Sequence, residues 1–255
     1  MKMHLQSLEG IPLIQPGDDL GSIILISLQD TQLTLENGDI LVVAQKIVSK
    51  AENRLVNLSQ VTPTEKACQL AARTGKDARL VELILQESRE ILRVDHGLII
   101  VEHQLGFVCA NAGIDHSNVR GSWGEAQDWY LLLPENPDRS AQKLRDYFFQ
   151  ACGVKIGVLI IDSHGRAWRN GVVGTTIGLA GLPGVVDLRG KLDIYGYELR
   201  STMVAAADEL ASAASLLMGQ ADERTPVVHV RGFPYALREA GLQELIRDKN
   251  RDLFR

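Results

Sequence analysis

The chain has 255 residues, of which 45% are hydrophobic and 23% charged, with a formal net charge of −5. This composition is typical of a globular protein with one large domain or two lobes, and its acidic balance argues against a nucleic-acid-binding protein. Three widely spaced cysteines without a CxxC pair suggest neither a disulfide framework nor a zinc site.

The amino-terminal part predicts an edge strand over residues 4–8, a loop over residues 10–17 and a helix over residues 20–28. Two prolines and two glycines keep the loop extended, so that it either lies against a planar ligand or only connects its neighbours. Asp18 or Asp19 can cap the helix. The terminus lacks the apolar core of a signal peptide and no apolar window could span a bilayer, so we expect a cytoplasmic protein without a membrane partner.

A buried strand over residues 39–44 is followed by Lys46 and Lys50. Open α/β sheets bind their ligands at the carboxyl ends of strands, where two lysines could neutralise phosphates as point charges. The alternative is that both lysines are simply solvated.

Two helices are predicted next, one starting near Thr64 and one over residues 77–92, and their amphipathic pattern suggests a lobe laid over a sheet. Strands over residues 98–101 and 107–110 follow, joined by a turn at residues 103–106. We expect His103 to lie on the surface of that turn and Cys109 to lie in the core.

Two polar segments follow apolar strands and form the most informative pattern in the chain. The first contains Asn111, Asp115, His116, Ser117 and Asn118, and the second contains Asp162, Ser163 and His164. Carboxylates and amides at strand ends suit a hard divalent cation and the phosphates that it carries. Each segment alone could be a polar turn whose side chains bond their own backbone, and His164 is the weaker candidate.

The rest of the chain predicts further elements of a mixed fold. Residues 120–130 form a protruding loop with exposed Trp123 and Trp129, which covers a substrate, meets another subunit or is a plain insertion. Ser140 caps a helix to residue 152, and residues 154–161 form a central strand. The strand over residues 172–181 lacks a Walker loop and a GxGxxG fingerprint. A helix over residues 198–218, a strand over 227–231 with a structural His229, and a helix from about 237 complete the chain.

We therefore expect one domain over residues 1–255, in one or two lobes, ending in a helical tail over residues 237–255. The fold class is α/β (α+β), with a mixed, largely antiparallel sheet and flanking helices instead of a Rossmann domain.

Over about residues 10–232 the chain resembles the coenzyme F420-0:L-glutamate ligases, the F420 gamma-glutamyl ligases. The resemblance rests on the motifs Gly10–Ile14, Val48–Glu52, Cys109–Asn118, Ile160–Arg166, Tyr195–Leu199 and Leu216–Gly219. It implies the fold of those ligases and a GTP-dependent addition of L-glutamate, and of successive gamma-linked glutamates, to the deazaflavin F420-0. An acyl phosphate would be the intermediate, and GDP and phosphate the products. It also implies two Mg²⁺ or Mn²⁺ ions, stimulation by K⁺, and a homodimer.

The resemblance also assigns roles to individual residues. It makes Lys50, Asp115 and Asp162 catalytic, and it assigns metal ligation to Asp115 and Asp162 for one ion and to Ser163 and Gln220 for the second. The expected nucleotide contacts are Ile11, Pro12, Leu13, Ile14, Gln45, Lys46, Lys50, Asn118, Met218, Gly219, Gln220, Ala221, Asp222, Glu223, Arg224 and Thr225.

Three departures from the family pattern bear on these roles. Ser163 stands where threonine is familiar and keeps the hydroxyl, while Gln220 stands where some members have glutamate and should hold a cation more weakly. The segment from Trp123 to Trp129 is longer than expected. The alternatives are a ligase of the same fold with another carboxylate acceptor, and a non-catalytic protein that binds nucleotide or metal.

Overall fold

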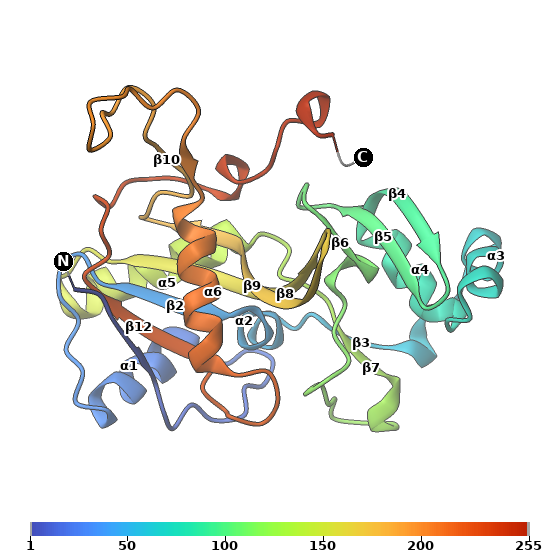
Figure 1. The fold of residues 1–255 in the computed structure, drawn as a ribbon. Helices are drawn as coiled ribbons and strands as arrows, with labels where there is room; N and C mark the ends of the chain where they lie inside the picture. The colour runs from blue at the N-terminus through green and yellow to red at the C-terminus, as the bar shows by residue number, and fades with distance from the viewer. Residues whose placement is uncertain (1, 254–255) are drawn as a thin grey trace.

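A five-stranded sheet forms the centre of the structure, a computed structural model that describes residues 2–253 (Figure 1). Its strands lie in the order β1 (His4–Ser7), β12 (Val227–Arg231), β2 (Ile40–Ala44), β8 (Gly157–Arg166) and β9 (Arg169–Ala180). Only β2 and β8 run parallel, and every other neighbouring pair is antiparallel. The predicted mixed, largely antiparallel sheet is confirmed, and the single parallel pair is unlike the parallel series of a Rossmann domain.

Helices cover both faces of this sheet. α1 (Leu20–Asp30) and α5 (Pro137–Cys152) pack on one face, and α6 (Ala206–Met218) packs on the other (Figure 1). Side chains alternate along a strand, so Leu41 and Val43 of β2 join the core under α1 and α5 while Ile40 and Val42 join the core under α6. The strand is therefore buried on both faces, which explains its continuous apolar sequence.

A smaller lobe lies beside the main sheet and has its own core. It consists of α3 (Glu65–Thr74), α4 (Ala78–Gln86) and the sheet formed by β4 (Ser88–Asp95), β5 (Leu98–His103) and β6 (Val108–Ala110). The helix predicted over residues 77–92 is present but ends at Gln86, and its last part is wrong, because residues 88–95 pair with β5 as a strand. Helical periodicity cannot reveal such a tertiary pairing.

Short elements connect these parts. α2 (Gln45–Ala51) follows β2 directly, β3 (Leu55–Asn57) pairs with β7 (Trp129–Leu131), and β10 (Val186–Asp187) pairs with β11 (Met203–Val204). Between β10 and β11 the chain extends as an arm (residues 188–202) away from the rest of the molecule (Figure 1). α6 begins at Ala206, so the helix predicted from residue 198 is shorter than expected.

The helical tail predicted over residues 237–255 is wrong for the described residues 237–253, which contain only two short 3₁₀ turns, Leu242–Glu244 and Lys249–Arg251. Tertiary partners satisfy the groups that a helix would have used. The Leu242 amide donates to the Asp138 carboxylate at 2.9 Å, and the side chains of Leu242, Leu245 and Ile246 pack on the α6 side of the main core. Apolar spacing that resembles a helix therefore belongs to an irregular segment.

Three single-residue expectations also fail. His103 is 2% exposed instead of lying on the surface, and Trp129 is 7% exposed, with its indole N–H donating to the Trp123 carbonyl at 2.6 Å. α5 is capped by Asn136, and Ser140 lies inside the helix. Cys109 is buried, as predicted. His229 is also buried, with Nε2 2.8 Å from Asp39 Oδ2, which agrees with the structural role predicted for it. Among the described residues, no helix is both long enough and apolar enough to cross a bilayer.

Candidate active site

Two parallel strand ends bring the first site residues together. β2 and β8 pair as far as Ala44 and Ile161, after which the chain continues as Gln45 and Lys46 on one strand and as Asp162 on the other. β2 turns into α2 at this point, whereas β8 continues in a hairpin with β9. Open sheets bind ligands at the carboxyl ends of adjacent parallel strands. For this reason we expected ligand-binding residues at these strand ends.

Asp115 is held at this edge by three groups. Its backbone forms an isolated antiparallel bridge with Leu131, and its carboxylate accepts a hydrogen bond from the Gln45 amide and lies 3.3 Å from Lys46 Nζ. The Ser49 hydroxyl donates to Gln45 Oε1 at 2.8 Å, which turns the amide nitrogen toward Asp115. Gln45 is 1% exposed, so this orientation is fixed in the core.

The pKa of Asp115 is raised to about 6, first because its partly buried carboxylate loses contact with water and second because the negative charge of Asp162 repels it. Lys46 and Gln45 oppose the shift and do not cancel it. The site therefore contains two interacting carboxylates whose charge the surrounding residues only partly compensate. A divalent cation between them would remove this repulsion.

Lys50 and Asn118 join the polar segments to the loop after α6. Lys50 Nζ donates to the Asn118 carbonyl at 2.7 Å, and the Asn118 amide donates to the Ala221 carbonyl at 2.8 Å. Burial, and then the nearby charge of Lys46, lowers the pKa of Lys50, while Asp115 acts in the opposite direction. In partly buried surroundings and beside another ammonium group, the charged form of a lysine is unfavourable. Binding of an anionic ligand stabilises this charged form.

Ser163 and Gln220 also lie together, as the resemblance implied. The Ser163 hydroxyl donates to Gln220 Oε1 at 2.8 Å, and Gln220 Nε2 donates to the Ser215 hydroxyl at 3.1 Å. Farther along the same loop, the Thr225 hydroxyl donates to the Leu217 carbonyl at 3.1 Å and so folds residues 218–225 back toward α6.

The loop at residues 11–14 presents a mixed surface. Leu13 is 76% exposed, whereas the Ile14 side chain is 4% exposed and belongs to the main core. The following Gly17 amide donates to the Ala51 carbonyl at the end of α2, at 2.9 Å. This bond ties the loop to the helix that carries Lys46 and Lys50. Any contact that Ile14 makes with a ligand must come from its backbone.

Comparison with known proteins identifies the family of the chain. The profile of the F420-0:gamma-glutamyl ligase family matches residues 10–232. The chain belongs to this family. Similar proteins named coenzyme F420:L-glutamate ligase occur in Methanothermobacter thermautotrophicus (46% identity, all of both chains), Methanopyrus kandleri (47%, 97% of both chains) and Methanocaldococcus jannaschii (40%, all of this chain and 97% of the relative). Every residue assigned to the site lies inside the matched range.

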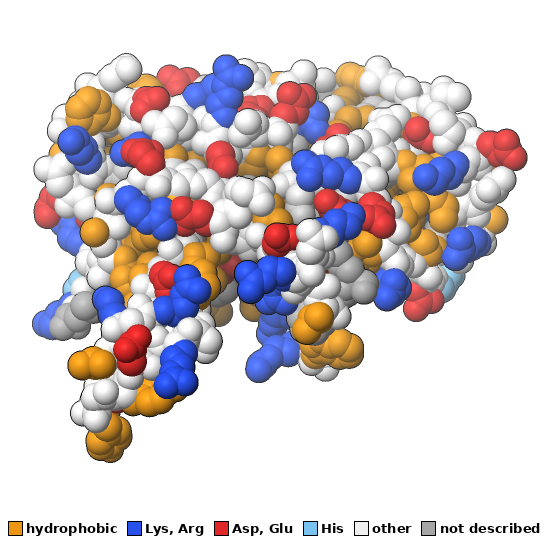
Figure 2. Space-filling view, turned by 90° about the horizontal axis from the view of Figure 1, so that it is seen from above, with side chains coloured by type: hydrophobic (Ala, Val, Ile, Leu, Met, Phe, Trp, Pro, Cys, Tyr) orange, Lys and Arg blue, Asp and Glu red, His pale blue; other side chains and the backbone are white. Residues whose placement is uncertain are grey.

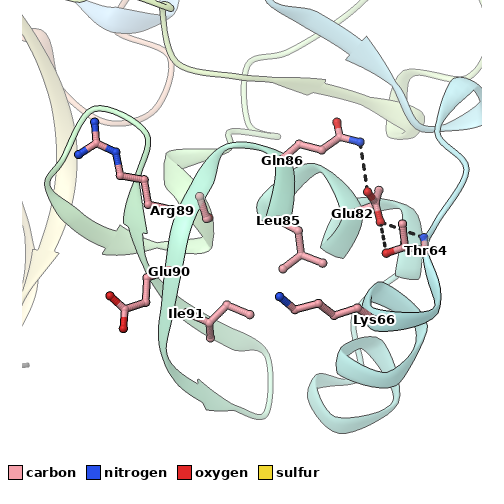
Figure 3. A pocket seen from close by; sticks show the side chains of 9 residues that line it. Thr64, Lys66, Glu82, Leu85, Gln86, Arg89, Glu90 and Ile91 are labelled. Carbon is pink, nitrogen blue, oxygen red and sulfur yellow. Dashed lines mark hydrogen bonds between the residues drawn. The ribbon is translucent and has the colours of Figure 1, made fainter.

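A separate open cavity of about 300 Å³ lies in the smaller lobe (Figure 3). That cavity is lined by Lys66, Glu82 and Arg89, among others, and by none of the predicted site residues. Glu82 accepts hydrogen bonds from the backbone and hydroxyl of Thr64, so its carboxylate stabilises the start of α3. The Glu82 carboxylate of this cavity therefore already has partners within the smaller lobe.

The oxygen groups at the strand ends could bind a hard cation, and only two of the groups considered, Asp115 and Asp162, are carboxylates. Among residues 2–253, no group of three or more His, Cys, Asp or Glu side chains is arranged to hold a metal. For such an ion, Asp115 and Asp162 would supply the charge, and the Ser163 hydroxyl and Gln220 amide would supply neutral oxygens. Oxygen ligands of this kind suit Mg²⁺ or Mn²⁺, which also take ligands from water and from phosphates.

Sequence reasoning missed two residues that shape the site. Ser49 orients Gln45, and Ser215 orients Gln220. Ser49 lies four residues after Gln45 in the same helix, which places both side chains on one face, so helical spacing could have revealed this pair. Ser215 lies near the end of a helix and bonds to a loop beyond it, and no periodicity predicts that contact.

Proposed function

We propose that the protein is a GTP-dependent ligase that adds L-glutamate, and then further gamma-linked glutamates, to F420-0. Family membership supports the ligase activity, and the pairing of Asp115 and Asp162 beside Lys46 and Lys50 supports phosphoryl transfer at this edge. Two carboxylates with two lysines can accept a metal-bound nucleoside triphosphate, because the carboxylates bind the cation and the lysines neutralise phosphate oxygens.

The proposed reaction has two steps. A carboxylate oxygen of the acceptor attacks the γ-phosphorus of GTP, the bond to the bridging oxygen breaks, and GDP leaves while an acyl phosphate forms. The glutamate amine then attacks the acyl carbon, loses a proton and expels phosphate to give the amide. Lys46 and Lys50 hold phosphate oxygens during the first step, and Asn118 and residues 218–225 orient the nucleotide. Water must be kept out, because it would hydrolyse the acyl phosphate.

In this proposal Asp115 and Asp162 bind one Mg²⁺ or Mn²⁺ ion, and Ser163 and Gln220 contribute to a second. Bound cations would neutralise the charge that develops on the transferred phosphoryl group. The loop at residues 11–14 would contact the guanine base, with the exposed Leu13 beside it. K⁺ is proposed as a stimulating ion from the family resemblance.

The decisive experiment incubates the purified protein with GTP, L-glutamate, Mg²⁺ or Mn²⁺ and F420-0, and follows phosphate release together with mass spectrometry of the acceptor. We expect equal amounts of GDP and phosphate, and a product heavier by one or more glutamyl units. GTP turnover without glutamylated F420-0 would indicate another carboxylate acceptor. Absence of turnover, with nucleotide binding retained, would favour a non-catalytic binding protein.

Gln220→Glu tests the second cation. Adding a negative charge to a metal ligand tightens binding, so we expect the Mn²⁺ concentration for half-maximal activity to fall by about tenfold. Ser215→Ala is the matched control, since it removes the partner of the Gln220 amide without changing charge. An unchanged metal dependence in Gln220→Glu would remove Gln220 from the ligand set.

A homodimer forms part of the proposal and is supported by the arm at residues 188–202. Leu192, Ile194, Tyr195 and Tyr197 on this arm are 56–90% exposed. Hydrophobic side chains gather toward the tip of an arm that projects from the body of the molecule (Figures 1 and 2). Exposed apolar groups collected on a projecting segment are typical of protein interfaces.

Replacing Ile194 and Tyr195 by Asp should therefore shift the protein from dimer to monomer in sedimentation equilibrium. Leu253→Asp, at another 90% exposed apolar side chain outside the arm, should leave the mass unchanged. A monomeric mass for the unmodified protein at micromolar concentration would contradict the dimer.

A further inference from the structure

His164 contacts the proposed metal-binding carboxylate directly. Asp162 and His164 are two residues apart on β8, so both side chains point to the same face of the sheet. His164 Nε2 lies 3.0 Å from Asp162 Oδ2, and the two side chains are 12% and 11% exposed. This close contact does not have the geometry of a hydrogen bond, and Nε2 of His164 forms no other hydrogen bond within residues 2–253. Asp162 is thus the polar group against which this buried ring nitrogen is held.

Two further rings hold His164 in this position. Phe107 packs on His164 in a tilted arrangement with ring centroids 5.3 Å apart, and its other neighbour is His103, stacked nearly parallel at 5.3 Å. We call His103, Phe107 and His164 the ring column. Phe107 also contacts all three of the larger core clusters, those on both faces of the main sheet and that of the smaller lobe. The middle of the column is therefore anchored where these cores meet.

The far end of the column is a neutral, buried imidazole. Nδ1 of His103 accepts a hydrogen bond from the Leu105 amide at 3.0 Å, which leaves the proton on Nε2. Burial, and then the charge of His164, lowers the pKa of His103 to about 4, so the ring is neutral at pH 7. A neutral ring stacks on Phe107 without the cost of burying a charge.

We propose that His164 is a positioning residue that holds the Asp162 carboxylate in the orientation needed to bind the divalent cation, and that Phe107 and His103 hold His164. This inference rests on the metal site of the proposed function. A carboxylate that is already oriented loses less freedom when it binds a metal, and groups that orient metal ligands typically change affinity by 10- to 100-fold when they are removed. The ring column would in this way connect the smaller lobe to the metal site.

The test measures Mn²⁺ binding by electron paramagnetic resonance, with and without GDP, in His164→Phe, His164→Gln and Asp162→Asn. His164→Phe keeps a ring against Phe107 and removes the nitrogen, so we expect Mn²⁺ to bind about 10- to 100-fold more weakly while the Tm changes little. His164→Gln can place an amide nitrogen near Asp162 and should recover part of the affinity. A purely structural role for His164 would lower the Tm and would not show this partial recovery.

Asp162→Asn separates the two ways in which the inference can fail. If Asp162→Asn loses Mn²⁺ while His164→Phe binds it as the unmodified protein does, the positioning role is wrong and the metal site stands. If Asp162→Asn also binds Mn²⁺ normally, the metal site itself is wrong. Should His164→Phe fold poorly, His164→Gln and Phe107→Leu provide the decision, since normal Mn²⁺ affinity in both would overturn the proposal.

Discussion

Asp162→Asn should lower kcat for GTP-dependent glutamylation by about 10³-fold or more while leaving the fold intact. Asparagine keeps the shape and one oxygen and removes the charge that a divalent cation requires. Asp162 lies at the end of the β2–β8 pairing, with 11% of its side chain exposed, and asparagine can keep an oxygen facing His164 Nε2, which lies 3.0 Å from the carboxylate. The loss should therefore appear in turnover and in metal binding, with a small change in Tm.

The matched control for this variant is Asp95→Asn, which removes an exposed carboxylate at the end of β4 in the smaller lobe. It should retain activity within about twofold. Initial rates at saturating GTP and a series of Mn²⁺ concentrations would be compared with the thermal transition of each variant. Near-normal turnover in Asp162→Asn would show that this carboxylate is no part of the active site.

Asp115→Asn should abolish activity to a similar extent and should also stabilise the metal-free protein at neutral pH. The pKa of Asp115 in the folded protein is about 6, above the ordinary value of 3.8. Its protonated form therefore contributes stability that is fully present below pH 3.8 and is lost as the pH rises through 6. A shift of this size corresponds to at most about 3 kcal/mol, and the lost contact with Lys46, 3.3 Å away, will reduce the gain.

Thermal unfolding in the presence of a chelator would measure this effect. At pH 7.5 we expect a higher Tm for Asp115→Asn than for the unmodified protein, and at pH 4 the two values should converge because the unmodified carboxyl is then protonated. Excess Mn²⁺ should reverse the order at pH 7.5, since only the unmodified site gains from binding the ion. A lower Tm for the variant at pH 7.5 without metal would contradict the repulsion between Asp115 and Asp162.

The candidate site was largely predictable because its residues occur in two short polar segments after apolar strands. Residues of one segment to which the proposed function gives a role, such as Asp162 and Ser163, are visible in the sequence as neighbours. Their association with Gln220, 57 positions away from Ser163, was inferred only from the family resemblance. The ring column shows most clearly what local sequence cannot predict. His103 has the local sequence of a surface turn, and its burial depends on Phe107 and the cores around it.

Hydrophobic periodicity and strand-end chemistry determined the fold class, the buried strands and the position of Asp162 directly after a strand, because these depend on neighbours within a few residues. The position of Asp115 beside Gln45 and Lys46 depends on tertiary contacts instead. Tertiary structure alone decided that residues 88–95 form a strand, that the carboxyl-terminal segment is irregular, and that Trp129 is buried. In each case a distant partner supplies the hydrogen bonds or the apolar contacts. The free energy of such long-range contacts exceeds the weak local preference of the chain for helix or strand. A local sequence pattern therefore cannot predict the outcome.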